Sequence, residues 1–201
     1  VSNVMLFLAR AYLKLARWKV IPPSEPFVDK MVLVAAPHTS NWDFMITIAA
    51  AKVSGLFIQW LGKEQLFKPP FGKFMRKLGG IPVVRSAKTG MVDRMVAEFS
   101  NHEKLCLVVP AEGTRTKTEY WKSGFYRIAE QADVPVILGF IDKSTRTCGF
   151  GPVITLTGNI SADMDKFRAF YEGKTGVKSG RFGPIRLREE SDSPEVGPAG
   201  D

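Results

Sequence analysis

Short apolar segments alternate with amphipathic segments along most of the chain, and this alternation is the feature that most restricts its fold. The apolar segments have the length of strands, and the segments between them show helical periodicity. Strands are predicted at 31–36, 56–61, 81–84, 105–109, 134–141 and 152–157, and helices at 42–54, 70–78, 88–100, 122–132 and 162–172. Strands that alternate with helices are typical of domains in which the strands pair in parallel. We therefore predict an α/β fold with a mostly parallel sheet flanked by helices.

The length of 201 residues and the hydrophobic content of 45% suit one packed domain rather than two. We predict that this domain spans 31–172. A linker with three prolines precedes it over 21–30, and a flexible tail follows over 173–201. The tail ends in a polar and acidic stretch, and such a composition is typical of disorder.

Residues 1–20 contain no acidic residue and predict an amphipathic helix with a wide apolar face. Its polar stripe consists of Asn3, Arg10, Lys14 and Arg17, and its apolar positions include Val4, Met5, Phe7, Leu8, Tyr12, Leu15 and Trp18. Three internal charges argue against a transmembrane span, and no small-residue cleavage site indicates a signal peptide. The pattern suits a helix that lies in the membrane interface, in which case its deletion should leave the domain folded. The alternative is a helix packed on the domain core, because periodicity alone does not separate the two.

The charge distribution indicates an anionic partner. The formal net charge is +8, and since the residues after Arg188 include five acidic and no basic side chains, residues 1–188 carry +13. Such a surface suits anionic lipid, phosphorylated substrates or nucleic acid.

Metal and disulfide chemistry find little support in the composition. The chain has two cysteines and two histidines, so a zinc site would need all four, and their spacing is not that of ligands. His102 directly follows a predicted helix, where a capping role is expected. We therefore predict no metal, no cofactor and no disulfide framework.

The segment His38-Thr39-Ser40-Asn41-Trp42-Asp43 places a histidine and an aspartate five residues apart, where a predicted strand leads into a helix. Pro37 ends the strand, and Thr39, Ser40 and Asn41 are all residues that favour helix N-caps. An Asp43 carboxylate in the first helical turn could bind one imidazole nitrogen of His38 and leave the other as a base. The alternative is a helix start at which the carboxylate serves only the helix dipole.

Charged residues also follow three other predicted strands. The turn Glu112-Gly113-Thr114-Arg115 follows one of them; Gly113 permits a tight turn, and Arg115 offers a planar fork for a phosphate or carboxylate. Arg85 and Lys63 follow the other two. Each of these alone would usually be a solvated charge, but their recurrence at strand ends predicts one site at the edge of the sheet. The sequence contains no G-x-S-x-G elbow, no P-loop and no complete dinucleotide-binding loop.

Together these segments resemble the motifs of the glycerolipid acyltransferases, the family of 1-acylglycerol-3-phosphate acyltransferase. His38 and Asp43 are similar to the family's H-x4-D signature. Three further blocks follow in the family's order: Gly80-Ile81-Pro82-Val83-Val84-Arg85, Glu112-Gly113-Thr114-Arg115 and Val134-Pro135-Val136-Ile137. The resemblance covers about residues 30–142. The chain departs from the family pattern at Pro37, where members often have Asn, and at Thr116, where Ser is usual.

The resemblance implies transfer of a fatty acyl chain from acyl-CoA or acyl carrier protein to a glycerol hydroxyl of lysophosphatidic acid in phospholipid biosynthesis. His38 would be the general base, and Asp43 would orient it. Arg85, Arg115 and Lys63 would hold the acceptor's phosphate, with Gly113 and Thr114 in the same binding turn. Glu112 would either contact the acceptor or hold an arginine in place. Backbone N–H groups at the helix start after His38 are the expected oxyanion donors.

Two alternatives to this function stay open. The first keeps the chemistry and changes the acceptor to glycerol 3-phosphate or another lysolipid. The second is a non-catalytic basic protein that binds membranes or nucleic acid. On the enzyme hypothesis we expect a peripheral, monotopic membrane protein on the cytoplasmic face that binds an anionic membrane surface and no nucleic acid.

Overall fold

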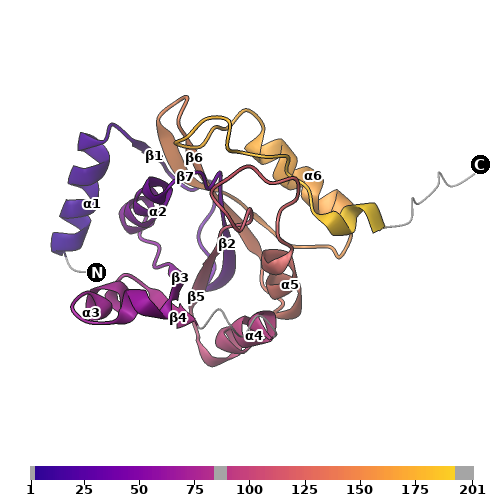
Figure 1. Ribbon diagram of the computed structural model, residues 1–201, viewed down its shortest axis with the longest axis horizontal. Helices are drawn as coiled ribbons and strands as arrows, with labels where there is room; N and C mark the ends of the chain where they lie inside the picture. Colours follow the sequence, from indigo (N-terminus) through magenta and orange to yellow (C-terminus); the bar gives the residue numbers. More distant parts are fainter. Residues whose placement is uncertain (1–2, 84–89, 193–201) are drawn as a thin grey trace, which may run out of the picture.

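The computed structural model describes residues 3–83 and 90–192, and within them seven strands form one sheet in the order β1-β7-β6-β2-β5-β3-β4 (Figure 1). Neighbouring strands pair in parallel except β6 and β7, which form an antiparallel hairpin. The strands are β1 Lys19–Ile21, β2 Lys30–Ala36, β3 Gln59–Lys63, β4 Gly80–Val83, β5 Leu105–Val109, β6 Val136–Asp142 and β7 Thr147–Ile154. This mostly parallel sheet confirms the predicted fold class.

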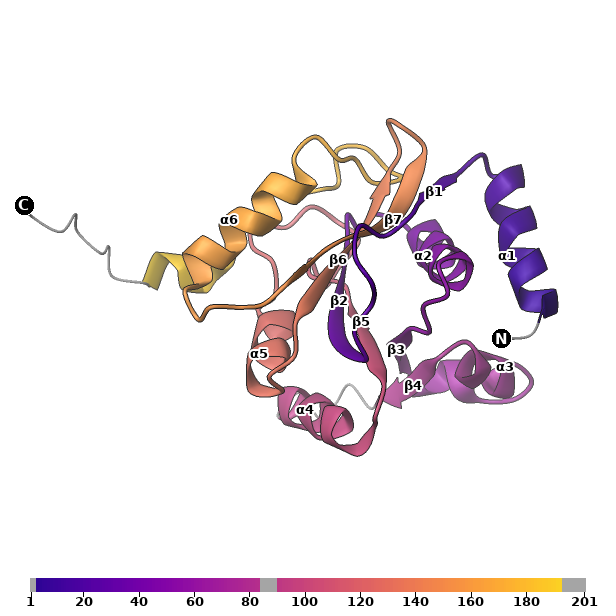
Figure 2. The same cartoon turned by 180° about the vertical axis from the view of Figure 1, so that it is seen from behind.

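Helices cover both faces of the sheet, as Figures 1 and 2 show. The α-helices are α1 Asn3–Leu15, α2 Asn41–Val53, α3 Gly72–Lys77, α4 Met91–Asn101, α5 Gly124–Gln131 and α6 Ile160–Tyr171, and the 3₁₀ helices are η1 Glu64–Phe67 and η2 Arg188–Asp192. Alternate residues of each central strand point to opposite faces. In β2, Val32 and Val34 join a core with α4, α5 and α6, whereas Met31 and Leu33 join a second core with α1 and α2.

The N-terminal segment differs from its prediction because it is a helix followed by a strand. Helix α1 ends at Leu15, Arg17 adopts a positive φ of 57°, and residues Lys19–Ile21 pair with β7 as strand β1. One face of α1 packs on the second core through Ala9 and Leu13. The fold therefore uses residues within 3–20 in its core and sheet, and deletion of residues 1–20 would remove packed structure.

The opposite face of α1 is exposed. Val4, Phe7 and Leu8 are 64%, 70% and 57% exposed, and Leu15 is also exposed. Of the two sequence-based alternatives for this helix, packing on the domain core thus applies to one face, and the placement of the helix in the membrane interface stays a prediction. Within the described residues, no helix combines the length and the apolar character that crossing a bilayer requires.

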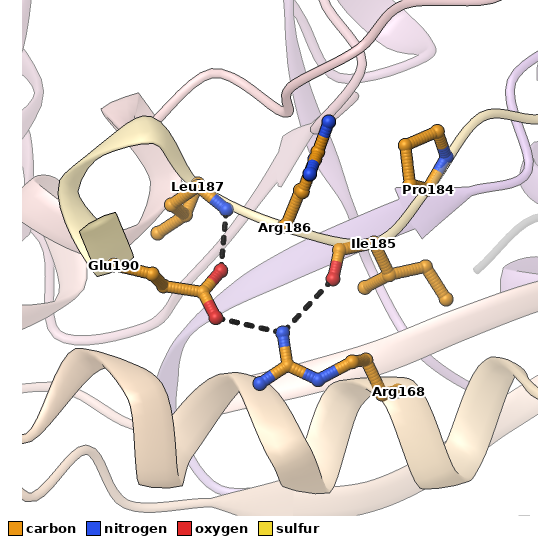
Figure 3. Close-up of a pocket in the computed structure, with 6 residues that line it drawn as sticks. All are labelled: Arg168, Pro184, Ile185, Arg186, Leu187 and Glu190. Atoms are coloured by element: carbon orange, nitrogen blue, oxygen red, sulfur yellow. Dashed lines mark hydrogen bonds and ion pairs between the residues drawn. The ribbon is translucent and has the colours of Figure 1, made fainter.

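The packed structure extends past residue 172, where the domain was predicted to end. Leu187 is 1% exposed, and Phe182 and Ile185 pack against the first core. Figure 3 shows how α6 holds this segment: Arg168 Nη1 donates to the carbonyl of Ile185 at 3.1 Å and to Glu190 at 2.7 Å. Long-range bonds place these residues on the domain, although their sequence has no helix or strand periodicity. The last residues of the predicted tail, 193–201, lie outside the described part.

Candidate active site

The carboxyl ends of β2 and β5 bring the two main predicted segments together. These strands are parallel neighbours, with Val34 opposite Val109, so the loops that leave them start side by side. His38 lies two residues beyond β2, and Glu112 lies three residues beyond β5. The backbone N–H of His38 donates to Glu112 Oε2 at 2.7 Å, across 74 residues of sequence.

Asp43 lies beside His38 and also caps helix α2. Ser40 is the N-cap, and its side chain accepts from the N–H of Trp42 at 3.0 Å. Asp43 Oδ2 accepts from the N–H groups of Ser40, at 2.6 Å, and Thr39. The same oxygen lies 3.9 Å from His38 Nδ1, which is within ion-pair range and longer than a hydrogen bond. The carboxylate therefore occupies both positions that the sequence suggested, at the helix cap and next to the imidazole.

The environment of His38 favours a neutral imidazole. Its side chain is 24% exposed, and this burial lowers the pKa of His38 below its usual value. The Asp43 carboxylate opposes the shift and the Arg115 guanidinium adds to it. A neutral imidazole at neutral pH can accept a proton, which is what a general base requires.

Glu112 is 1% exposed and contacts the histidine loop. Its Oε2 accepts the His38 N–H, whereas its Oε1 is buried with no hydrogen-bond partner among the described residues. Burial raises the pKa of Glu112 to about 7, and the nearby Asp43 carboxylate adds to this shift. The described ion pairs join Glu112 to no arginine. The bond to the His38 backbone was not among the roles that the sequence suggested, because nothing in the sequence shows which loops meet.

Arg115 and the start of α2 line a cleft of about 370 Å³ next to the His38 loop. Gly113 makes the turn before it with a φ of 67°, which favours glycine. Arg115 Nη1 donates to the side chain of Asn41. The lining residues are Thr39, Ser40, Asn41, Trp42, Thr114, Arg115, Thr116, Lys178 and Arg181. Lys178 and Arg181 were missed by the sequence analysis, since they lie in an aperiodic segment that was assigned to the tail.

Among the described residues, the predicted site residue Lys63 does not line this cleft. Lys63 is exposed at the end of β3, a parallel neighbour of β5. Arg85 lies outside the described residues. The sequence suggested backbone N–H groups at the helix start after His38 as oxyanion donors. In this segment the N–H groups of Thr39, Ser40 and Trp42 already bind side chains of their own turn.

The described residues offer little for metal or thiol chemistry. Among residues 3–83 and 90–192, no group of three or more His, Cys, Asp or Glu side chains could hold a metal ion. Both cysteines are buried, and burial raises the pKa of Cys106 and Cys148 to about 12. Thiols with such a pKa carry almost no nucleophilic thiolate at neutral pH.

Comparisons with known proteins identify the family and a similar fold. A family model described as Acyltransferase matches residues 19–138, a range that contains His38, Asp43 and Arg115. Among solved structures, the fold is similar to that of the 1-acyl-sn-glycerophosphate (LPA) acyltransferase PlsC from Thermotoga maritima, with a TM-score of 0.55 and 16% identity. The match covers 84% of this chain and 75% of that chain. A comparison with curated protein sequences gives no match.

Proposed function

The chain belongs to the acyltransferase family, and we propose that it moves a fatty acyl chain from a thioester to a glycerol hydroxyl of lysophosphatidic acid in phospholipid biosynthesis. The observation that carries the proposal is a half-buried His38 with Asp43 Oδ2 at 3.9 Å, beside a cleft lined by cations. Two observations support lysophosphatidic acid as the acceptor. The structurally similar PlsC is a 1-acyl-sn-glycerophosphate (LPA) acyltransferase, and a cleft lined by cations suits a phosphate group. Acyl-CoA and acyl carrier protein are the two donor classes.

In this mechanism His38 acts as the general base. The neutral imidazole takes the proton of the acceptor hydroxyl while the oxygen attacks the thioester carbonyl. The tetrahedral intermediate then expels the thiolate, which takes the proton from the imidazolium, so that a C–O bond replaces a C–S bond. No acyl-enzyme forms, and no metal or cofactor is required. General-base catalysis of this kind typically contributes about 10²- to 10⁴-fold.

Asp43 supports the imidazolium that forms in this step. Its carboxylate is 2% exposed and fixed by two backbone N–H groups, so it keeps its position while the histidine changes charge. A fixed negative charge near Nδ1 favours the protonated ring, and a small movement of the ring would turn the 3.9 Å contact into a hydrogen bond. Glu112 holds the His38 backbone by accepting its N–H.

We also propose that the protein binds the cytoplasmic face of an anionic membrane as a peripheral protein. The exposed apolar residues of α1 have a counterpart in Phe71 and Phe74, which are 66% and 50% exposed at the start of α3. Helices α1 and α3 lie at the same end of the molecule (Figures 1 and 2). Exposed apolar groups flanked by basic side chains suit the interface of an anionic bilayer, where long-chain substrates are concentrated.

The direct test measures transfer of a labelled acyl chain from acyl-CoA and from acyl carrier protein. The acceptors are lysophosphatidic acid, glycerol 3-phosphate and lysolipids with other head groups. We expect transfer to lysophosphatidic acid, and a loss of about 10²-fold or more in His38→Ala. His102→Ala is the matched control, because among the described residues His102 pairs only with its own helix, at the carbonyl and the carboxylate of Glu98. Unchanged turnover in His38→Ala would refute the assigned base, and no transfer to any acceptor would refute the function.

A second pair of variants separates catalysis from helix capping. Asp43→Asn removes the charge near His38, whereas Ser40→Ala keeps that charge. Ser40→Ala removes the cap bonds that the Ser40 hydroxyl accepts from the N–H groups of Trp42 and Asp43, and its 3.4 Å bond to Asp43 Oδ1. We expect Ser40→Ala to cost about 1 kcal/mol of stability with little change in kcat. Asp43→Asn should lower kcat strongly. Equal kcat values in the two variants would leave Asp43 with a capping role only.

A further inference from the structure

Two cations from the C-terminal part of the domain line the cleft beside His38. Lys178 and Arg181 face it together with Arg115, and all three side chains are exposed to solvent. Among the described residues, no carboxylate lines the cleft. In the described part of the chain, neither Lys178 nor Arg181 forms an ion pair. Three positive charges thus gather at one cleft with no internal counter-charge.

The segment that carries these residues, here named the strap (residues 175–183), is fixed at both ends. At its start, the backbone N–H and the hydroxyl of Thr175 each donate to Asp142 Oδ1 at 3.2 Å. At its end, the Phe182 ring packs 6.3 Å from the ring of Trp121. Gly183 lies against the backbone of Thr118, where a Cβ atom would overlap the carbonyl oxygen. These anchors hold the strap against the domain.

Between its anchors the strap is joined to the turn that carries His38. The backbone N–H of Lys178 donates to Thr39 Oγ1 at 3.0 Å. Gly176 is buried against Thr39 and Pro37, and a Cβ atom there would overlap the Thr39 side chain. Thr39 is itself fully buried and donates its own N–H to Asp43. The strap is therefore joined directly to the turn that carries the candidate base.

We propose that Lys178 and Arg181 complete, together with Arg115, a clamp for the phosphate group of a substrate. A phosphate monoester carries nearly two negative charges, and guanidinium and ammonium groups bind it through charge-assisted hydrogen bonds. The hydroxyl and amide groups of Thr114, Thr116 and Asn41 provide further polar partners in the same cleft. The proposal rests on the proposed acyl transfer, in which phosphate occurs in the lysophosphatidic acid acceptor and also in the pantetheine-bearing donor.

Steady-state kinetics of the full chain test the clamp and identify the source of the phosphate. The test variant is Lys178→Gln/Arg181→Gln. The control, Arg94→Gln/Lys104→Gln, loses the same charge on exposed residues of α4 and of the loop before β5, away from the cleft. We expect KM to rise about ten-fold or more for the phosphorylated partner, with kcat nearly unchanged. A rise confined to lysophosphatidic acid assigns the clamp to the acceptor, and a rise confined to acyl-CoA assigns it to the donor. KM values equal to those of the control for both substrates would overturn the proposal.

A binding measurement separates failure of the clamp from failure of the proposed function. If the wild-type chain transfers no acyl group, inorganic phosphate is titrated into both variants and the wild type by calorimetry. Binding that weakens about ten-fold in Lys178→Gln/Arg181→Gln, and not in the control variant, supports the clamp without the acyl transfer. Equal affinity in all three proteins, or no binding to the wild type, overturns the clamp.

Discussion

Glu112 accepts a hydrogen bond from the backbone of the candidate base His38, and its own carboxyl group has a raised pKa. Its carboxyl is buried, accepts the backbone N–H of His38 through Oε2, and keeps Oε1 without a partner among the described residues. A carboxylate without a second partner is poorly stabilised in such a place, so burial raises the pKa of Glu112 from 4.5 to about 7. The folded protein therefore favours the protonated acid over the ion.

This raised pKa predicts a loss of stability with rising pH. Below pH 4.5 both the folded and the unfolded chain hold the Glu112 proton, whereas between 4.5 and about 7 only the folded chain holds it. The unfolded state is thus favoured increasingly across this window, and the shift corresponds to about 3 kcal/mol. Glu112→Gln has no proton to lose, and its amide can still accept the His38 N–H. In urea unfolding, we expect the variant to gain stability relative to wild type by about 3 kcal/mol more at pH 8 than at pH 4.5. An equal difference at both pH values would contradict a protonated, buried carboxyl.

At the residue scale, the sequence was informative where local geometry decides the outcome. The spacing from His38 to Asp43, together with Ser40, was enough to predict a helix cap beside an imidazole, because those contacts lie within one turn. The contact of Glu112 with His38 spans 74 residues and depends on the pairing of β2 with β5. No local pattern encodes that pairing.

At the scale of elements, the same distinction explains which segments were predicted. The central strands have continuous apolar runs because both faces of the sheet are covered, and these runs gave the fold class. Strand β1 has three residues and is fixed by its pairing with β7, so its sequence carries no strand pattern. The strap has no regular structure, and its path is defined by long-range contacts with Asp142, Thr39, Trp121 and Thr118.

Helix α1 offers a test of its two faces. Leu13 is 4% exposed in the second core, whereas Phe7 is 70% exposed on the outer face. We expect Leu13→Ala to lower the free energy of unfolding by about 3 kcal/mol, because it leaves a cavity in the core. Phe7→Ala should change it by less than about 0.5 kcal/mol. Chemical denaturation of both variants measures the difference. If Leu13→Ala proved as stable as Phe7→Ala, the helix would not be part of the core.

At the scale of the whole molecule, exposed apolar and basic side chains are unevenly distributed over the protein surface. Helices α1 and α3, which carry exposed apolar residues, lie at one end (Figure 1). The loops that carry His38 and Arg115 follow the carboxyl ends of β2 and β5, and the strap is bonded to the first of these loops. Basic side chains accompany the apolar groups, with Arg10 and Lys14 on α1 and Lys73 on α3. The sequence analysis predicted a membrane-binding role for the first helix and its basic charge. It predicted α3 only as a helix of the domain, without such a role.

This arrangement predicts vesicle binding that needs both helices and anionic lipid. The variants Phe7→Ala/Leu8→Ala and Phe71→Ala/Phe74→Ala each remove exposed apolar area, and each should lower the vesicle partition coefficient on the order of ten-fold. Val28→Ala is the control, because Val28 is exposed before the amino end of β2, whereas His38 follows its carboxyl end. Co-sedimentation with vesicles of phosphatidylglycerol and phosphatidylcholine measures the partition, and high salt should weaken it by screening the basic side chains. If the α3 variant bound like the control while the α1 variant did not, the membrane-facing surface would be restricted to α1. Wild-type partition in both variants would show that neither helix contacts the membrane.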